Sequence, residues 1–129
     1  MTILGESFAL CRLPAGSPIP AWTNDATTFL TISRSREELS IIADEGVVPE
    51  GVDARRGYRA FCVDGPLPKD LVGIIAAMAT PLAEAVIPIF PIATFDTDYV
   101  LVHEDDLLRA IAALEEAGHR VRQEGDAAT

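Results

Sequence analysis

The hydrophobic pattern of residues 58–124 changes its period several times, and this succession most constrains the fold. Short apolar runs predict strands, whereas apolar residues that recur every three or four positions predict helices. In order, the segments predict strand, helix, strand, strand, helix, strand. This is the split βαβ plan, in which an antiparallel sheet carries both helices on one face. The pattern therefore predicts an α+β fold.

The first strand and first helix of this region have clear signals. Residues 58–64 form an apolar strand that Gly65 and Pro66 end. The helix is expected from Asp70, and Pro81 inside it predicts a kink or a restarted turn. The stripe of the helix that faces the core consists of Leu71, Ile74, Ile75, Met78, Leu82 and Ala85.

A second hairpin and a second helix follow. Residues 87–93 and 99–102 predict paired strands, and the prolines of the first of them suggest a sheet edge or a bulge. Acidic residues 104–106 suit the positive end of a helix that Gly118 ends, and Val121 could open a last strand. The residues expected to face the core are Leu107, Leu108, Ile111 and Leu114.

The first half of the chain predicts the same plan with its helices reduced to loops. A strand at residues 8–13 is followed by a hairpin of residues 29–33 and 39–43, and a loop spans residues 45–57. We therefore expect a truncated first module at residues 1–57, a second module at 58–124, and a flexible tail at 125–129.

Charge and composition argue against several classes of function. A formal net charge of −10 repels phosphate backbones, so nucleic acid is not an expected partner. No apolar run reaches the roughly 18 residues that a membrane span needs. The first residues lack the basic start and apolar block of a secretory signal, so we expect a cytoplasmic protein without membrane contact.

No motif predicts catalysis, a cofactor or a metal site. Cys11 and Cys62 lie far apart in apolar surroundings, which favours reduced packing residues. His103 precedes three acidic residues, but an acidic helix start explains them without a metal. His119 follows a helix end, where a structural role is expected. A nucleophile elbow and a Walker loop are both absent from the sequence, so we expect no enzyme.

One block of the chain, Thr94-Phe95-Asp96-Thr97-Asp98-Tyr99, matches a known family most specifically. With it, the chain resembles a family of small bacterial proteins built from two ACT modules, related to the ACT regions of the animal cytosolic arginine sensors. The other matching segments are Ile19-Pro20-Ala21-Trp22, Glu38-Leu39-Ser40-Ile41, Val48-Pro49-Glu50-Gly51, Arg56-Gly57-Tyr58-Arg59, Gly65-Pro66-Leu67, Gly73-Ile74 and Pro81-Leu82-Ala83-Glu84-Ala85. Family members more often have glycine after that last alanine, where this chain has Val86. The resemblance implies tandem ferredoxin-like ACT modules.

The resemblance also implies a ligand loop between the first strand and first helix of the second module, here residues 65–73. Backbone N–H groups at a helix start attract a carboxylate, so Val72, Gly73 and Ile74 are candidate ligand-binding residues. The alternative is that Gly73 only lets the helix and the sheet pack closely.

The Thr94 to Asp98 turn supplies the other candidate ligand residues. The arginine-sensor resemblance implies that Asp96 or Asp98 bonds the cationic end of a ligand, with Thr94, Phe95 and Thr97 around them. The alternative is that these polar residues only stabilise the turn.

We therefore expect a regulatory or sensing module that binds a small molecule, most simply an amino acid, and forms a homodimer. A protein-interaction or oligomerisation module without a ligand is the main alternative, and a small enzyme is the other. A ligand screen separates the first two.

Overall fold

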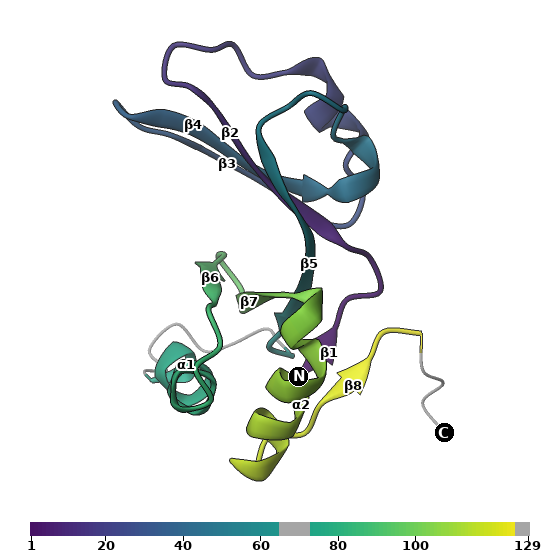
Figure 1. The fold of residues 1–129 in the computed structure, drawn as a ribbon, viewed down its shortest axis with the longest axis vertical. Helices are drawn as coiled ribbons and strands as arrows, with labels where there is room; N and C mark the ends of the chain where they lie inside the picture. Colours follow the sequence, from purple (N-terminus) through teal and green to yellow (C-terminus); the bar gives the residue numbers. More distant parts are fainter. Residues whose placement is uncertain (65–72, 126–129) are drawn as a thin grey trace. The chain divides into compact units, whose positions relative to one another are not determined.

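The structure is a computed structural model that describes residues 1–64 and 73–125. Its chain divides into two compact units (Figure 1). We call residues 6–58 the first unit, and residues 1–5 together with the chain from residue 59 onward the second unit. The candidate ligand residue Val72 lies outside the described residues, as does most of the 65–73 loop.

The first unit is an antiparallel sheet in the order β3-β4-β2-β5. Its strands are β2 (Phe8–Pro14), β3 (Leu30–Arg34), β4 (Glu38–Asp44) and the first part of β5 (Ala54–Cys62). The predicted hairpin is confirmed, because β3 pairs with β4 in antiparallel register. Two short 3-10 helices, η1 (Ala21–Asp25) and η2 (Glu45–Val47), stand where this plan would have α-helices. Trp22 packs against the core of this unit, as an anchor residue should.

The start of β5 corrects one prediction. The loop predicted for residues 45–57 ends early, because β5 begins at Ala54 and pairs with β2 through Arg55 and Leu10. The register shifts between Phe8 and Leu10, and Gly57 opposite them has a left-handed φ of 80°. A β-bulge of this kind interrupts the alternating pattern. Gly57 therefore led to the prediction that the loop ends at residue 57, although this glycine lies within β5.

The second unit has the strand order β6-β7-β5-β1-β8. Its elements besides the end of β5 are β1 (Thr2–Ile3), α1 (Ile74–Glu84), β6 (Phe90–Ala93), β7 (Asp98–His103), η3 (Glu104–Asp106), α2 (Leu107–Glu116) and β8 (Arg122–Gln123). Among the described residues β6 pairs only with β7, so it is the edge strand that its prolines predicted. The predicted order of strands and helices is confirmed.

The short strand β1 has no counterpart among the predicted elements. It lies between β5 and β8, antiparallel to the first and parallel to the second. The side chain of Ile3 is fully buried in the core of the second unit. The first residues of the chain are therefore part of the sheet that the second half of the chain builds.

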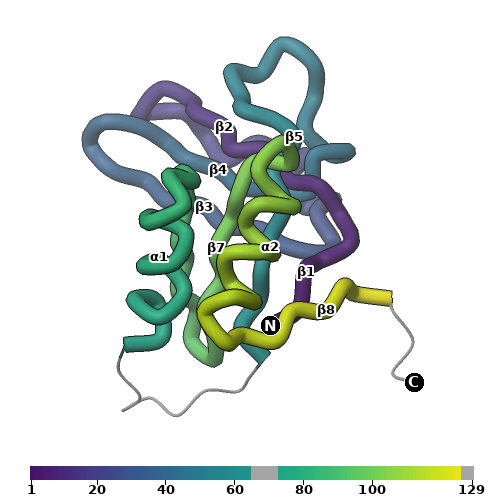
Figure 2. The backbone as a smooth tube through the Cα atoms, turned by 60° about the horizontal axis from the view of Figure 1, so that its bottom comes forward, coloured from purple at the N-terminus to yellow at the C-terminus, as the bar shows by residue number. Residues whose placement is uncertain are grey.

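Both helices cover one face of this sheet (Figure 2). The core between the two layers contains Ile3, Phe61, Met78, Leu82, Ile87, Val100, Val102, Ala110 and Leu114. Leu107 and Ile111 pack against this core as predicted, but Leu108 is 81% exposed. Residue 108 lies about 100° around the helix from residue 107, whereas Ala110 continues the buried stripe. The prediction for Leu108 was wrong.

Helix α1 continues through Pro81 instead of restarting there. Proline has no N–H, so the carbonyl of Ala77, four residues earlier, loses its partner within the helix. The Nε2 atom of His119 lies 2.9 Å from that oxygen. Because a carbonyl only accepts, His119 carries the proton on Nε2 and donates it. The structural role predicted for His119 is thus a bond to the neighbouring helix.

The two helices end in the same backbone motif but with different residues. After α1, the N–H groups of Val86 and Ile87 donate to Ala83 and Leu82, and equivalent bonds follow α2 at Gly118 and His119. This Schellman motif places one residue in the left-handed region, where glycine is preferred. Gly118 has a φ of 98°, while Val86 adopts 59° and is 81% exposed. Val86 therefore pays a backbone strain that glycine would avoid.

Replacing Val86 with glycine should raise the free energy of unfolding by about 0.5–1 kcal/mol. Relief of left-handed strain contributes about 1–2 kcal/mol, and the greater freedom of glycine in the unfolded chain offsets part of it. Gly118→Ala is the matched opposite and should lower the free energy of unfolding by about 1 kcal/mol, because alanine rarely adopts the φ of 98° found at Gly118. A Cβ at this position would meet no neighbour, so backbone strain is the only cost. Urea unfolding measures both, and a destabilised Val86→Gly variant would contradict the explanation.

Candidate functional site

The start of α1 has a glycine at its N-cap, so the cap residue itself offers no side chain to the first backbone N–H groups. Gly73 precedes the helix with a left-handed φ of 83°, and Ile74 is its first residue. Gly73 has no side chain that could accept a hydrogen bond at this cap, and the first turn of α1 contains no acidic residue. The first N–H groups of an α-helix have no partner within the helix and attract anions. The start of α1 is therefore suited to a carboxylate.

The structure also tells apart the two interpretations of Gly73. A Cβ atom placed on Gly73 would meet no atom of the described residues within 4 Å. Among the described residues, close packing of helix and sheet therefore does not require a glycine here. The positive φ does, because residues with a side chain rarely adopt it.

The Thr94 to Asp98 turn is held by its two threonines. The N–H and hydroxyl groups of Thr94 donate to the carbonyl of Thr97 at 2.8 and 3.0 Å. The N–H of Thr97 donates back to the Thr94 hydroxyl at 3.3 Å. Phe95 and Asp96 form the exposed tip, and Asp98 begins β7. The threonines thus have the turn role of the alternative interpretation, whereas the carboxylates of Asp96 and Asp98 take no part in these bonds.

The turn lies against the end of β5, where the chain enters residues 65–72. The Thr97 hydroxyl donates to the carbonyl of Val63, and the N–H of Val63 donates to the carbonyl of Asp98 at 3.0 Å. Within residues 1–64 and 73–125, no hydrogen bond or ion pair joins the carboxylates of Asp96 and Asp98 to Gly73 or Ile74. The structure therefore brings the turn to one end of the predicted ligand loop, with α1 at its other end.

Two further side chains, Cys62 and Tyr99, lie where the end of β5 meets the Thr94 to Asp98 turn. Neither was predicted as a ligand residue. Burial raises the pKa of the Cys62 thiol, although hydrogen bonds with Tyr99 and Thr97 act against it. Burial, with a contribution from Cys62, raises the pKa of Tyr99 as well. Both groups are therefore neutral at pH 7, and a protonated thiol is a poor nucleophile. The position of Tyr99 in the Thr94 to Tyr99 block was the available signal.

Asp64, just after β5, is paired with residues at both ends of the chain. Its carboxylate accepts the Thr2 hydroxyl at 2.7 Å and lies 3.2 Å from the Met1 amino group and 3.7 Å from Arg122. The Thr2 hydrogen bond, against some desolvation, holds the pKa of Asp64 below its usual value. Asp64 therefore ties β1 and β8 to β5 instead of serving a ligand.

His103 and the acidic residues after it form a helix start, as predicted. The Nδ1 atom of His103 accepts the N–H of Asp105 at 3.2 Å. Among the described residues, no three His, Cys, Asp or Glu side chains are close enough to hold one metal ion. In the same part of the chain, no helix is both long and apolar enough to cross a bilayer.

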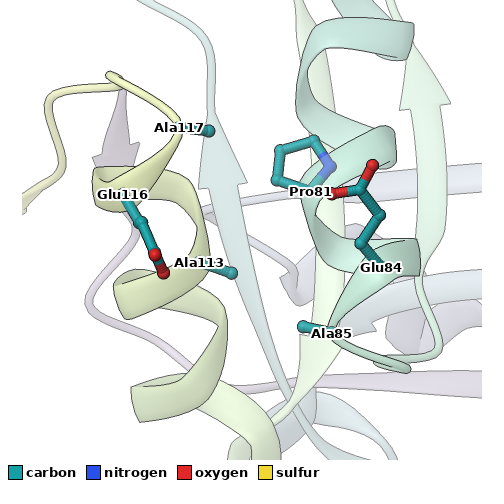
Figure 3. Close-up of a pocket in the computed structure, with 6 residues that line it drawn as sticks. All are labelled: Pro81, Glu84, Ala85, Ala113, Glu116 and Ala117. Atoms are coloured by element: carbon teal, nitrogen blue, oxygen red, sulfur yellow. The ribbon is translucent and has the colours of Figure 1, made fainter.

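A groove of about 390 Å³ runs between α1 and α2. Figure 3 shows the side chains that line it, which come from the C-terminal end of each helix. They are Pro81 and Glu84 on α1 with Ala85 just after it, and Ala113 and Glu116 on α2 with Ala117 just after it. This groove could not be predicted from the sequence, because it exists only once the two helices lie side by side.

Comparison with protein families assigns the second part of the chain. The model of an ACT domain matches residues 53–116, and the second unit has the strand and helix order of that fold. The chain therefore contains an ACT domain at residues 53–116. A separate model, of an N-terminal domain, matches residues 6–51. Every predicted ligand residue, from Val72 to Asp98, falls within the ACT match.

Solved structures agree with this assignment. A protein from Agobacterium tumefaciens is 36% identical, with a TM-score of 0.89 over 95% of this chain and 91% of that one. A Vibrio cholerae protein of unknown function, described as a possible transport protein, is 20% identical, with a TM-score of 0.71 over 91% and 88%. The regulatory subunit of aspartate kinase from Thermus thermophilus, in its ligand-free form, is 14% identical, with a TM-score of 0.60 over 88% and 92%. The last two share only the fold, and a search of curated proteins gave no match.

ACT domains generally bind small-molecule ligands for regulation. In this ACT domain, the helix start and the turn of β6 and β7 lie at the two ends of the loop between first strand and first helix. These features fit the regulatory, ligand-binding role that ACT domains generally have.

Proposed function

We propose that this ACT domain binds an amino acid and has no catalytic activity of its own. The observation that carries the proposal is the start of α1, where the N-cap residue is Gly73 in the left-handed conformation and supplies no capping side chain. The ligand carboxylate would accept N–H groups at residues 72–74. The cationic end would meet Asp96 or Asp98, whose carboxylates have no partner among the described residues.

We infer that the chain as a whole is a cytoplasmic tandem ACT protein that works as a homodimer, related to the arginine sensors. The two units support the tandem arrangement, since β3-β4-β2-β5 has the strand order of the split βαβ plan. The edge strand β6 supports association, because it leaves one row of backbone groups open to another strand. Similarity in fold to a regulatory subunit of aspartate kinase supports a regulatory role.

A thermal-shift screen against the standard amino acids should find one that stabilises the protein. A ligand at a hundred times its dissociation constant adds about 2.7 kcal/mol to the free energy of unfolding. For a chain of this size, that raises the melting temperature by roughly 5–10 °C. Light scattering on the same samples should find dimers.

Variants that remove a single negative charge test whether Asp96 and Asp98 bind the ligand. Asp96→Asn or Asp98→Asn should weaken the binding of the selected amino acid by about tenfold to a hundredfold, the scale of a charged hydrogen bond. Glu104→Gln is the matched control, because Glu104 is exposed and lies at the far end of β7. If no amino acid shifts the melting temperature, the protein-interaction module becomes the better explanation. Equal losses in Glu104→Gln would also contradict the proposed site.

A further inference from the structure

Strand β3 forms an open edge of the first unit, because among the described residues it pairs only with β4. The N–H of Ser35 donates to the carbonyl of Glu38 at 2.9 Å, which makes these two residues a hydrogen-bonded pair of the hairpin. Such pairs alternate with non-bonded ones along an antiparallel ladder, so the backbone groups of Leu30, Ile32 and Arg34 face away from β4. These groups form no hydrogen bond within residues 1–64 and 73–125. β3 therefore has a row of backbone donors and acceptors that is open to another strand.

The other edges in the described part of the sheet are less suited to pairing. In β6 the bond between Thr94 and Thr97 sets the same alternation, which turns the nitrogen of Pro91 outward, and proline has no N–H to donate. Strand β8 has only two residues. Prolines and short strands are common means of protecting an edge from pairing. β3 has five residues, no proline and an unbroken register with β4, so it lacks this protection.

The charge around β3 allows a second copy of the chain to approach. Two molecules with a formal net charge of −10 repel each other overall. Residues 26–36, which include the whole of β3, contain no acidic residue and two arginines, Arg34 and Arg36. The repulsion between two acidic copies is therefore reduced where their β3 strands meet.

The sequence of β3 is complementary to itself in one antiparallel register. When Ile32 lies opposite Ile32 of a second copy, all the outward backbone groups of both strands find partners. On one face Leu30, which is 40% exposed, then lies opposite Arg34 of the other copy, whose alkyl chain would cover it. On the other face Thr31 lies opposite Ser33, and such hydroxyl pairs hydrogen-bond across strands. No two residues of like charge are directly opposite within β3 in this register.

We propose that two copies of the chain associate through β3, paired antiparallel about a two-fold axis at Ile32. The inference rests on the homodimer inferred above and assigns its interface. An interface of this kind is isologous, so it is complete with two copies. Short paired strands bury little area, which places the dimer among weak complexes, with a dissociation constant on the order of ten micromolar.

Two matched proline variants identify the edge. Leu30→Pro removes an outward donor of β3 but leaves the bonds to β4 in place, because the N–H of Leu30 faces away from β4. Each copy then loses a hydrogen bond at the interface, so the dissociation constant should rise about tenfold or more. Ala93→Pro makes the same change on the outward side of β6 and should leave the dissociation constant unaltered. Sedimentation velocity over a concentration series measures the dissociation constant, and circular dichroism checks that each variant is folded.

Charges at position 30 test the register. The guanidinium of Arg34 is held by the carbonyls of Ala15 and Ser17, both at 2.8 Å, so its charge has a fixed place on each copy. Leu30→Lys sets a like charge opposite Arg34 of the other copy and should weaken dimerisation about threefold to tenfold. Leu30→Glu sets an opposite charge there and should not weaken it.

The results separate the interface from the rest of the proposed function. An unchanged dissociation constant in Leu30→Pro would overturn the β3 interface, and a loss in Ala93→Pro alone would place the contact at β6. Equal weakening by Leu30→Lys and Leu30→Glu would overturn the register. A parent protein that stays monomeric throughout the series would overturn the homodimer and this interface together. The thermal-shift screen tests amino-acid binding independently of all these measurements.

Discussion

Ile3→Ala is expected to lower the free energy of unfolding by about 3 kcal/mol. Truncating a buried isoleucine removes apolar contacts and leaves a cavity, at a cost of about 2–5 kcal/mol. Ile3 is fully buried in the core of the second unit, next to Phe61 on β5. The measurement is urea unfolding, with the midpoint and slope compared to the parent protein.

Ile19→Ala provides the matched control for this substitution. Ile19 is 53% exposed, so the same truncation should change stability by no more than about 0.5 kcal/mol. Equal effects at Ile3 and Ile19 would show that β1 is not a stable part of the ACT sheet. A large effect at Ile3 alone would establish that residues far apart in the sequence share one core.

Asp44→Ala should destabilise the protein by a similar amount, about 3 kcal/mol. The carboxylate of Asp44 is 8% exposed and accepts the N–H groups of Thr28 and Phe29 at 3.0–3.2 Å, with the Thr27 hydroxyl at 3.4 Å. Removing it leaves buried donors without an acceptor, and each hydrogen bond to a charged group contributes about 1.5–3 kcal/mol. Asp25→Ala, at an exposed aspartate, should change stability by less than about 0.5 kcal/mol.

The contribution of Asp44 should also depend on pH. Burial alone would raise its pKa, but the hydrogen bonds from Phe29 and Thr28 outweigh burial and lower it. A carboxyl group whose pKa is lower in the folded state stabilises the protein fully above its unfolded value, near 3.9. That stability is lost as the pH falls through the folded value. The stability difference between the parent protein and Asp44→Asn should therefore shrink below about pH 4, and a constant difference from pH 7 to pH 2 would contradict this assignment.

Hydrophobic periodicity was enough to predict the main elements of the ACT domain. Both helices and the β6–β7 hairpin follow from it, because their buried faces repeat over many residues. Strand β1 could not be predicted in this way, since two residues are too few for a period. The start of β5 was hidden by Gly57, whose left-handed conformation belongs to a bulge and not to a loop. Leu108 shows the remaining limit, because apolar residues also occur at exposed positions.

The candidate site was predictable in its parts but not in its assembly. The glycine before a helix and the polar turn are local signals, and both occur where they were expected. The bond between Thr97 and Val63 joins segments that only the sheet brings together. The groove between the helices could not be predicted either, because it forms only when α1 and α2 lie side by side.

The central claim is that the start of α1 and the β6–β7 turn bind an amino acid. A ¹H–¹⁵N NMR titration with the amino acid that gives the largest thermal shift tests it most directly. The proposal predicts saturable shifts at Gly73, Ile74 and residues 94–98, with the groove residues 113–117 unchanged. Shifts confined to other parts of the chain, or none at saturating concentrations of any amino acid, would contradict it.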